Sequence, residues 1–276
     1  RVKDSTYKHG YRQVVYLISG QGGGSRAAAW FIYKMWQYEN IDPTFYNKIF
    51  SISAVSGSIS GANMYMAAKH FNVFPNRNDS CELKLFVKYI YGNNYLSSGI
   101  FGLVLSDYFI DGPRNWFGNS KRDRNYHFQN EEINSFKNYV LNVKFKDSSE
   151  ISKKEVKNRI YEYFLGDYLE NYQPSKVNIP MFFINTAEVD NGTKAIFSPV
   201  LMDSFSTFKN AYLRYRECTN NNYKALPLIS CVNQGQAFPL INSYNLIHGV
   251  GRLGDGGFYE NSGAETTLEV YNKLNK

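Results

Sequence analysis

Two strand–turn–helix units in the first seventy residues constrain the fold of this chain more than any other feature. Residues 13–19 are apolar and β-branched, a glycine cluster follows them, and residues 27–38 then read as a helix that is apolar on most of its circumference. Residues 48–55 repeat the pattern, with a second strand, a Ser-Gly turn at 56–57 and a second helix from Ser58. Strands that alternate with helices at this spacing predict right-handed parallel crossovers, and so an α/β fold.

The second half of the chain continues this pattern less regularly. Residues 177–189 and 194–198 are strand-like runs joined by an Asn-Gly turn, which is a strong signal for a hairpin. We expect a helix around residues 226–236, a short strand around 246–250 and a final helix over 262–274. Together these elements predict a largely parallel central sheet with helices on both faces.

The segment between these parts, residues 76–174, is harder to read. Aromatic residues, charges and Gly-Pro interruptions alternate there, and only one helix, near 153–168, is well indicated. We expect a partly helical insertion that caps or flanks the sheet and is a candidate lid. Its charge-free run, 89–106, has an apolar part too short to cross a bilayer, although it could touch one. Since no Gly/Ser/Pro-rich linker borders the insertion, residues 1–276 are predicted to form a single domain.

Composition narrows the classes of protein that fit. With 43% hydrophobic and 20% charged residues, the chain has ordinary globular usage, which argues against disorder and coiled coils. Its 23 Tyr and 20 Phe exceed what a core needs, so some rings should lie at a surface or line a pocket. The net charge of +7 permits attraction to polyanions, but acidic residues interrupt the basic runs, and we expect no nucleic-acid partner.

Neither the cysteines nor the N-terminus narrows the location of the protein further. The three cysteines share no Cys-x-x-Cys spacing and specify neither a disulfide framework nor a metal site. Because the sequence begins at Arg1 rather than Met, we expect a trimmed or mature fragment, and the absence of a signal peptide is uninformative. We expect a cytoplasmic or membrane-peripheral location.

The first turn, residues 20–26, places three consecutive glycines at a helix N-terminus. Unpaired N–H groups and the helix dipole favour a negative ligand there. A P-loop needs Gly-Lys-Ser/Thr at its end, whereas this turn ends in Gly-Ser-Arg at 24–26. A dinucleotide site is open, because Gly22, Gly24 and Ala27 satisfy G-x-G-x-x-A, and so are an oxyanion hole and a tight turn without a ligand.

The second turn places a serine between small residues, in Ala-Val-Ser-Gly-Ser at 54–58. A nucleophile elbow is usually written G-x-S-x-G, because strand and helix approach closely and only small flanking residues fit. Here alanine and serine take the flanking positions. Ser56 lies directly at the end of the apolar strand, so we prefer it to Ser58 and Ser60 as the nucleophile. Taken alone, the pattern favours an ordinary helix N-cap.

A nucleophilic serine needs a base, and the sequence offers two. In the chain order Ser, Asp, His, the histidine would be His248, with Asp190 or Asp203 as the acid. The other candidate is Asp255, which lies between glycines at the end of a strand-like run and could equally be only a turn former. The residues themselves leave both readings open.

Three short motifs in a fixed order resemble those of the patatin-like phospholipases. They are Gly-Gly-Gly-Ser-Arg at 22–26, Ala-Val-Ser-Gly-Ser at 54–58 and Asp-Gly-Gly at 255–257. Ala-Phe-Pro-Leu at 237–240 and the hairpin around 190–192 add support. The resemblance covers roughly residues 13–72 and 177–262.

The resemblance implies a lipid acyl hydrolase, of phospholipase A or lysophospholipase type, that needs no metal or cofactor. Ser56 would be the nucleophile and Asp255 the base, so the catalytic dyad would lack histidine. The oxyanion hole would be formed by Gly22, Gly23 and Gly24, with Arg26 supporting the loop. Both turns would lie at the carboxyl edge of adjacent parallel strands, with a lipid ester as substrate and a peripheral membrane contact.

Two other functions stay open at this point. One is a catalytically silent relative that binds lipid or a membrane, suggested by the non-glycine flanking residues Ala54 and Ser58. The other is an esterase with a Ser-His-Asp triad that uses His248.

Overall fold

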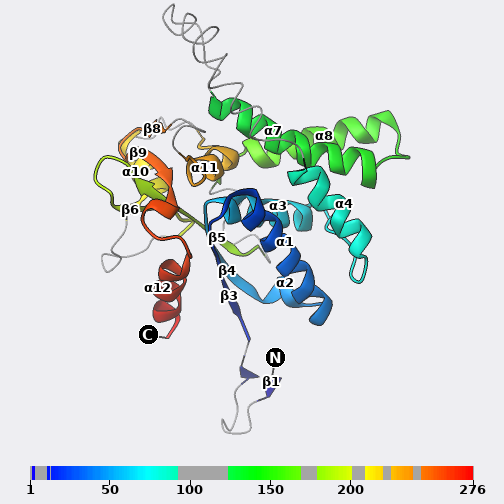
Figure 1. Ribbon diagram of the computed structural model, residues 1–276, viewed down its shortest axis with the longest axis horizontal. Helices are drawn as coiled ribbons and strands as arrows, with labels where there is room; N and C mark the ends of the chain where they lie inside the picture. Colours follow the sequence, from blue (N-terminus) through cyan, green and yellow to red (C-terminus); the bar gives the residue numbers. More distant parts are fainter. Residues whose placement is uncertain are drawn as a thin grey trace, which may run out of the picture.

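The computed structural model describes residues 2–3, 11–12, 14–92, 124–168, 179–200, 209–219, 225–238 and 244–275. In this part of the chain a mostly parallel central sheet is flanked by helices (Figure 1). The predicted α/β class is confirmed.

Three neighbouring strands of the sheet are parallel: β3 (Tyr16–Gly20) at its edge, then β4 (Ile49–Val55) and β5 (Met181–Glu188). Helix α1 (Gly24–Ile41) follows the glycine turn after β3, and α3 (Gly57–His70) follows β4 directly. The predicted strand–turn–helix units are therefore present. Because β3 and β4 are adjacent and parallel, both turns leave the sheet at the same carboxyl edge.

Two strands share one edge of β5. Positions 181–185 of β5 pair with β4, and positions 186–188 pair with β9 (Gly251–Asp255), while β6 (Lys194–Phe197) occupies the opposite edge. Strand β9 is antiparallel to β5, so its last residue points back toward the end of β4. The ends of β4 and β9 consequently meet beside the middle of β5.

Alternating side chains divide the sheet into two faces. Ile52 and Ile184 belong to the large core that α1, α3 and α11 (Leu228–Gln234) build on one face, and the partly buried Ile18 packs against it. Residues of the opposite orientation, such as Phe183, pack with Val270 of α12 (Ala264–Leu274) on the other face. The period of two along each strand thus accounts for the layered arrangement in Figure 1.

The described part of segment 76–174 is more helical than predicted. Besides α8 (Glu150–Leu165), which matches the expected helix, it contains α4 (Ser80–Tyr91), α7 (Arg124–Tyr139) and the π-helical turn η2 (Val140–Lys144). In α4 the buried residues Leu83, Phe86 and Ile90 recur at helical spacing, a stripe that its flanking charges obscured. These helices pack outside α1 and α11 and form an outer layer (Figure 1).

Most of the charge-free run 89–106 lies outside the described residues. Among the helices that are described, none has the length and apolarity needed to span a membrane. The remaining short elements are β1 (Val2–Lys3), β2 (Tyr11–Arg12), α2 (Phe45–Lys48), β7 (Lys209–Asn210), α10 (Ala211–Cys218), β8 (Asn245–Ile247) and η3 (Gly256–Phe258).

Candidate active site

Ser56 lies at a strained turn between β4 and α3. Its backbone has φ 52° and ψ −131°, a conformation that serine rarely adopts, and the other non-glycine residues with positive φ in the described chain are two asparagines. Such strain persists where the surrounding structure imposes it, often at functional sites. Although Ser56 occupies the N-cap position, its side chain makes no capping hydrogen bond. The simple N-cap interpretation of this serine is therefore wrong.

The Ser56 hydroxyl instead donates a hydrogen bond to Asp255, with 2.5 Å between Oγ and Oδ2. The two residues are 199 positions apart in the sequence, and the end-to-end meeting of β4 and β9 along β5 brings them together. The other carboxylate oxygen, Oδ1, accepts the N–H of Gly257 at 2.8 Å. Two hydrogen bonds thus fix the carboxylate, one of them to the candidate nucleophile.

Asp255 is buried, with 4% of its surface exposed. Burial raises the pKa of this carboxyl above its usual value, and the hydrogen bonds from Ser56 and Gly257 partly oppose the rise. A carboxylate with a raised pKa is a stronger base, so this environment favours removal of a proton from Ser56.

The glycine turn packs directly against Ser56. A Cβ atom added to Gly22 would lie 3.0 Å from Cβ of Ser56, and one added to Gly57 would lie 1.8 Å from the carbonyl oxygen of Gly24. Gly23 and Gly24 have positive φ, of 148° and 59°. A side chain at Gly57 would therefore collide with the glycine turn, whereas Gly23 and Gly24 favour glycine because of their backbone conformation.

The turn offers backbone donors beside the Ser56 hydroxyl. The N–H of Gly22 already donates to the carbonyl oxygen of Asn261 at 2.9 Å. Gly24 is the first residue of α1 and Gly23 precedes it, and among the described residues no side-chain hydrogen bond caps this end of the helix. The first N–H groups of a helix lack intrahelical acceptors, so Gly23 and Gly24 are the better candidates for binding an oxyanion.

Arg26 lies in the first turn of α1 and is exposed. Within the described residues its guanidinium makes no hydrogen bond or ion pair with the glycine turn. The supporting role expected for Arg26 stays a prediction.

The two competing serines are held in the interior. The Ser58 hydroxyl accepts the N–H of Val55 at 3.0 Å and donates to the carbonyl oxygen of Gly20 at 2.7 Å, which joins the ends of β3 and β4. Ser60 is also buried and donates to the carboxyl of Glu132. Ser58 and Ser60 are 1% and 4% exposed, whereas Ser56 is half-buried.

The structure does not bring the residues of the alternative triad together. His248 is exposed in the turn that precedes β9, whereas Asp255 lies at the far end of that strand, which is about 13 Å long at 3.3 Å per residue. Asp190 forms an ion pair with Arg252, 3.4 Å apart, in another exposed turn. Asp203 lies outside the described residues.

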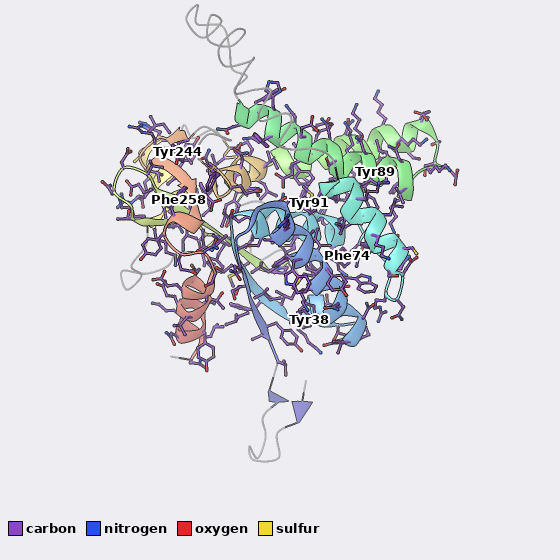
Figure 2. The ribbon with its side chains drawn as sticks, viewed as in Figure 1. Tyr38, Phe74, Tyr89, Tyr91, Tyr244 and Phe258 are labelled. Atoms are coloured by element: carbon purple, nitrogen blue, oxygen red, sulfur yellow. The ribbon has the colours of Figure 1, made fainter. Side chains whose placement is uncertain are left out.

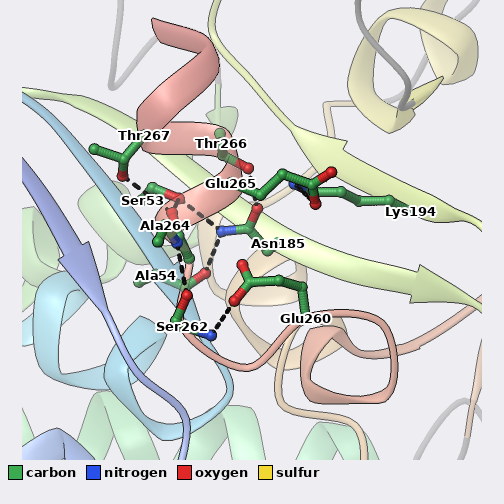
Figure 3. A network of polar contacts seen from close by, with 11 residues as sticks. Ser53, Ala54, Asn185, Lys194, Glu260, Ser262, Ala264, Glu265, Thr266 and Thr267 are labelled. Atoms are coloured by element: carbon green, nitrogen blue, oxygen red, sulfur yellow. Dashed lines mark hydrogen bonds and ion pairs between the residues drawn. The ribbon is translucent and has the colours of Figure 1, made fainter. Parts of the chain in front are cut away.

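A buried polar network that the sequence analysis missed holds the segment after Asp255 (Figure 3). The Asn185 side chain donates to the Ser53 hydroxyl at 2.9 Å and to the Ala54 carbonyl at 2.8 Å, and it accepts from Thr266 of α12 at 2.6 Å. The Ser53 hydroxyl in turn donates to the carbonyl oxygen of Gly263. Asn185 inside the apolar run of β5 and Ser53 inside that of β4 were the available signal for such a network.

Aromatic side chains border the dyad on the side of β9. The rings of Phe238 and Phe258 stack at 5.7 Å, and both are exposed. Tyr244 lies close enough for the negative charge of Asp255 to raise its pKa, although burial contributes more. Figure 2 labels Tyr244 and Phe258 in the part of the molecule that contains β8 and β9. An apolar substrate would therefore meet aromatic surface beside the dyad.

In the part of the chain that the structure describes, no group of three or more His, Cys, Asp or Glu side chains is arranged to hold a metal ion. The comparisons with known proteins give no match, either to a family model or to a curated protein sequence. Any functional conclusion therefore depends on the geometry of the site.

Proposed function

We propose that this chain is a serine acyl hydrolase of the patatin-like type, which cleaves carboxylic esters of lipids. The observation that carries the proposal is the 2.5 Å hydrogen bond from Ser56 Oγ to Asp255 Oδ2, made by a serine at a strained strand-to-helix turn. The glycine turn beside it supports the same chemistry, because its free N–H groups could hold a negatively charged oxygen. Acyl transfer needs these three components: a nucleophile, a base and an oxyanion hole.

The proposed reaction has two steps. In the first, Asp255 takes the proton of the Ser56 hydroxyl while Oγ attacks the ester carbonyl, and the N–H groups of Gly23 and Gly24 stabilise the oxyanion. The alcohol then leaves with the proton from Asp255. In the second step Asp255 takes a proton from water, the resulting hydroxide attacks the acyl-enzyme, and Ser56 leaves with that proton as the fatty acid is released.

A fluorophosphonate probe, which reacts with activated serines, tests the proposal on the purified protein. We expect labelling of the natural sequence and loss of labelling in Ser56→Ala and in Asp255→Asn. Ser60→Ala is the matched control, since Ser60 also bonds a carboxyl but is buried, and it should keep the label. Labelling that survives in Ser56→Ala would overturn the assignment of the nucleophile.

A lipid panel then separates hydrolysis from silent binding. Fatty-acid release that depends on Ser56 would support the hydrolase. Co-sedimentation with vesicles, together with no release from any lipid of the panel, would instead support the catalytically silent lipid-binding alternative.

A further inference from the structure

The segment that follows Asp255 returns to the glycine turn. Residues 256–258 form the turn η3, and the carbonyl oxygen of Asn261 then accepts the N–H of Gly22 at 2.9 Å. One backbone hydrogen bond thus joins the segment that carries the base to the turn beside the nucleophile. The two-step reaction uses Asp255 and the glycine turn but gives no role to the residue that joins them.

The side-chain amide of Asn261 lies beside both members of the dyad. A Cβ atom added to Gly22 would collide with its oxygen, Oδ1, and would also lie 3.0 Å from Cβ of Ser56. A Cβ atom added to Gly257 would lie 3.0 Å from Oδ1 of Asn261 and 3.1 Å from Oδ1 of Asp255. The amide oxygen therefore lies next to the nucleophile on one side and next to the base on the other, in space that two glycines leave open.

The amide is accessible and, within the described residues, makes no hydrogen bond. Asn261 is exposed, although its backbone is bonded to Gly22. The neighbouring Glu260 differs, because one of its carboxylate oxygens accepts the N–H of Ser262 in the same loop (Figure 3). The Asn261 amide is thus available to a molecule bound at the dyad, whereas that carboxylate oxygen is occupied within the loop.

The loop that carries Asn261 is held at both ends. At its start, the carbonyl oxygen of Gly256 accepts two backbone N–H groups, at 3.0 Å each, in a tight turn. At its end, the carbonyl oxygen of Gly263 accepts the hydroxyl of Ser53 at 2.9 Å, and Ser53 belongs to the buried network of Figure 3. These backbone anchors hold the side chain of Asn261 at a fixed place beside the dyad, as a residue that orients a reactant requires.

The hydrolysis of the acyl-enzyme benefits from a second acceptor besides Asp255. A water molecule has two hydrogens, and Asp255 takes only one of them. If a fixed acceptor binds the other hydrogen, the two bonds together orient the water so that a lone pair of its oxygen faces the acyl carbon on Ser56. The first step needs no such group, because the Ser56 hydroxyl has a single hydrogen and bonds Asp255 directly.

We propose that Oδ1 of Asn261 accepts a hydrogen bond from the hydrolytic water and, together with Asp255, orients this water toward the acyl group on Ser56. The inference rests on the proposed function and adds a residue to its second step. One water hydrogen passes to Asp255 as the oxygen bonds to the acyl carbon, and the other stays on the oxygen. The bond between that carbon and Ser56 Oγ then breaks, Oγ takes the proton from Asp255, and the carboxylic acid leaves.

Competition between water and methanol tests this role on the acyl-enzyme. Methanol has one hydroxyl hydrogen, which Asp255 takes, so its attack does not depend on Asn261. During turnover of a p-nitrophenyl ester at a fixed methanol concentration, Asn261→Leu should raise the ratio of methyl ester to free acid about tenfold, the effect of one lost hydrogen bond. Ser56→Ala gives the uncatalysed background. Since the ratio depends neither on the folded fraction nor on the acylation rate, a merely structural role would not change it.

Two variants serve as controls. Asn261→Asp keeps an acceptor oxygen at the same place and should keep the natural ratio, whatever its effect on the rate. Asn158→Leu makes the leucine change at an exposed asparagine of α8 and should also keep the ratio. A ratio that Asn261→Leu leaves unchanged, in an enzyme that turns over the ester, would overturn the role of Asn261 and leave the hydrolase proposal intact. An equal rise in Asn261→Asp would overturn it too, because the amide nitrogen would then be the group that acts.

Labelling by the fluorophosphonate probe separates this role from that of an oxyanion donor. The probe reacts with Ser56 in a step that involves no water, so Asn261→Leu should be labelled at the rate of the natural sequence. Acyl-Ser56, measured by intact mass after rapid quenching, should accumulate in the variant because only its hydrolysis is slowed. Slower labelling with an unchanged product ratio would show that the amide binds the oxyanion, and would overturn the proposal. No labelling and no turnover in the natural sequence would overturn the proposed function and this role of Asn261 with it.

Discussion

Helix α3 and its N-cap residue carry two serines, one turn apart, that each hydrogen-bond a carboxyl group. Ser56 donates to Asp255 with 2.5 Å between the oxygens, and Ser60 donates to Glu132 while its oxygen lies 3.0 Å from the hydroxyl of Tyr91. Both carboxyls are buried, and burial raises the pKa of both, that of Glu132 to about 7. In their direct contacts the two pairs are alike.

The pairs differ in what surrounds the hydroxyl. Ser56 has a positive φ and is half-buried, and the glycine turn packs against it. Within the described residues, the N–H groups of Gly23 and Gly24 in this turn have no backbone acceptor. Ser60 lies inside regular helix, where backbone N–H groups are bonded within the helix, and it faces Glu132 of α7. A carboxyl partner is therefore insufficient to mark a nucleophile. The backbone strain, the access and the nearby donors distinguish the first pair from the second.

The largest expected effect is on the turnover of a short ester, which should depend on one of the two carboxyl groups and not on the other. Asp255→Asn removes the proposed base and should lower kcat by about a thousandfold or more. Glu132→Gln should keep kcat within about threefold, because Glu132 bonds a buried serine that makes no contact with substrate in the proposed mechanism. Equal losses in the two variants would show that the second pair takes part in the reaction.

The close packing of the two turns should contribute to the free energy of unfolding. In Gly57→Ala the new methyl group would lie 1.8 Å from the carbonyl oxygen of Gly24, so we expect a loss of about 3 kcal/mol or more in the free energy of unfolding, measured in urea. Gly192→Ala is the control, since its Cβ meets no atom within 4 Å. Gly192→Ala should lower the free energy of unfolding by only about 1 kcal/mol, because alanine is disfavoured at the positive φ of this position. Similar losses would mean that the two turns do not pack as closely as described.

The second pair should dominate the pH dependence of stability near neutrality. Burial raises the pKa of Glu132 from 4.5 to about 7, so between these values the folded chain binds more protons than the unfolded chain. The free energy of unfolding should therefore fall as pH rises through this window, by up to about 3 kcal/mol. Glu132→Gln should flatten this slope in urea unfolding at pH 5 and pH 8.

The control for this measurement is Glu131→Gln, which removes a carboxyl from a less buried position on the same helix. It should leave the slope in place. A slope that persists in Glu132→Gln would mean that other groups cause the pH dependence.

The local sequence determined most of the sheet and the two turns. Apolar β-branched runs predicted β3, β4 and β5 because the period of the side chains records which face is buried. The Asn-Gly pair predicted the β5–β6 hairpin for a similarly local reason. Helices α4 and α7 were missed, since aromatic and charged residues alternate there and their apolar stripes are narrow.

Only the tertiary structure decided which carboxyl group Ser56 contacts. From residue types and chain order, either His248 or Asp255 could be the base. The register of the strands brings together residues almost two hundred positions apart, and a local sequence pattern does not contain that register. The resemblance of the three motifs favoured Asp255, and the pairing of β4 and β9 with the same edge of β5 brings Asp255 to Ser56. The same register sends His248 to the opposite end of β9.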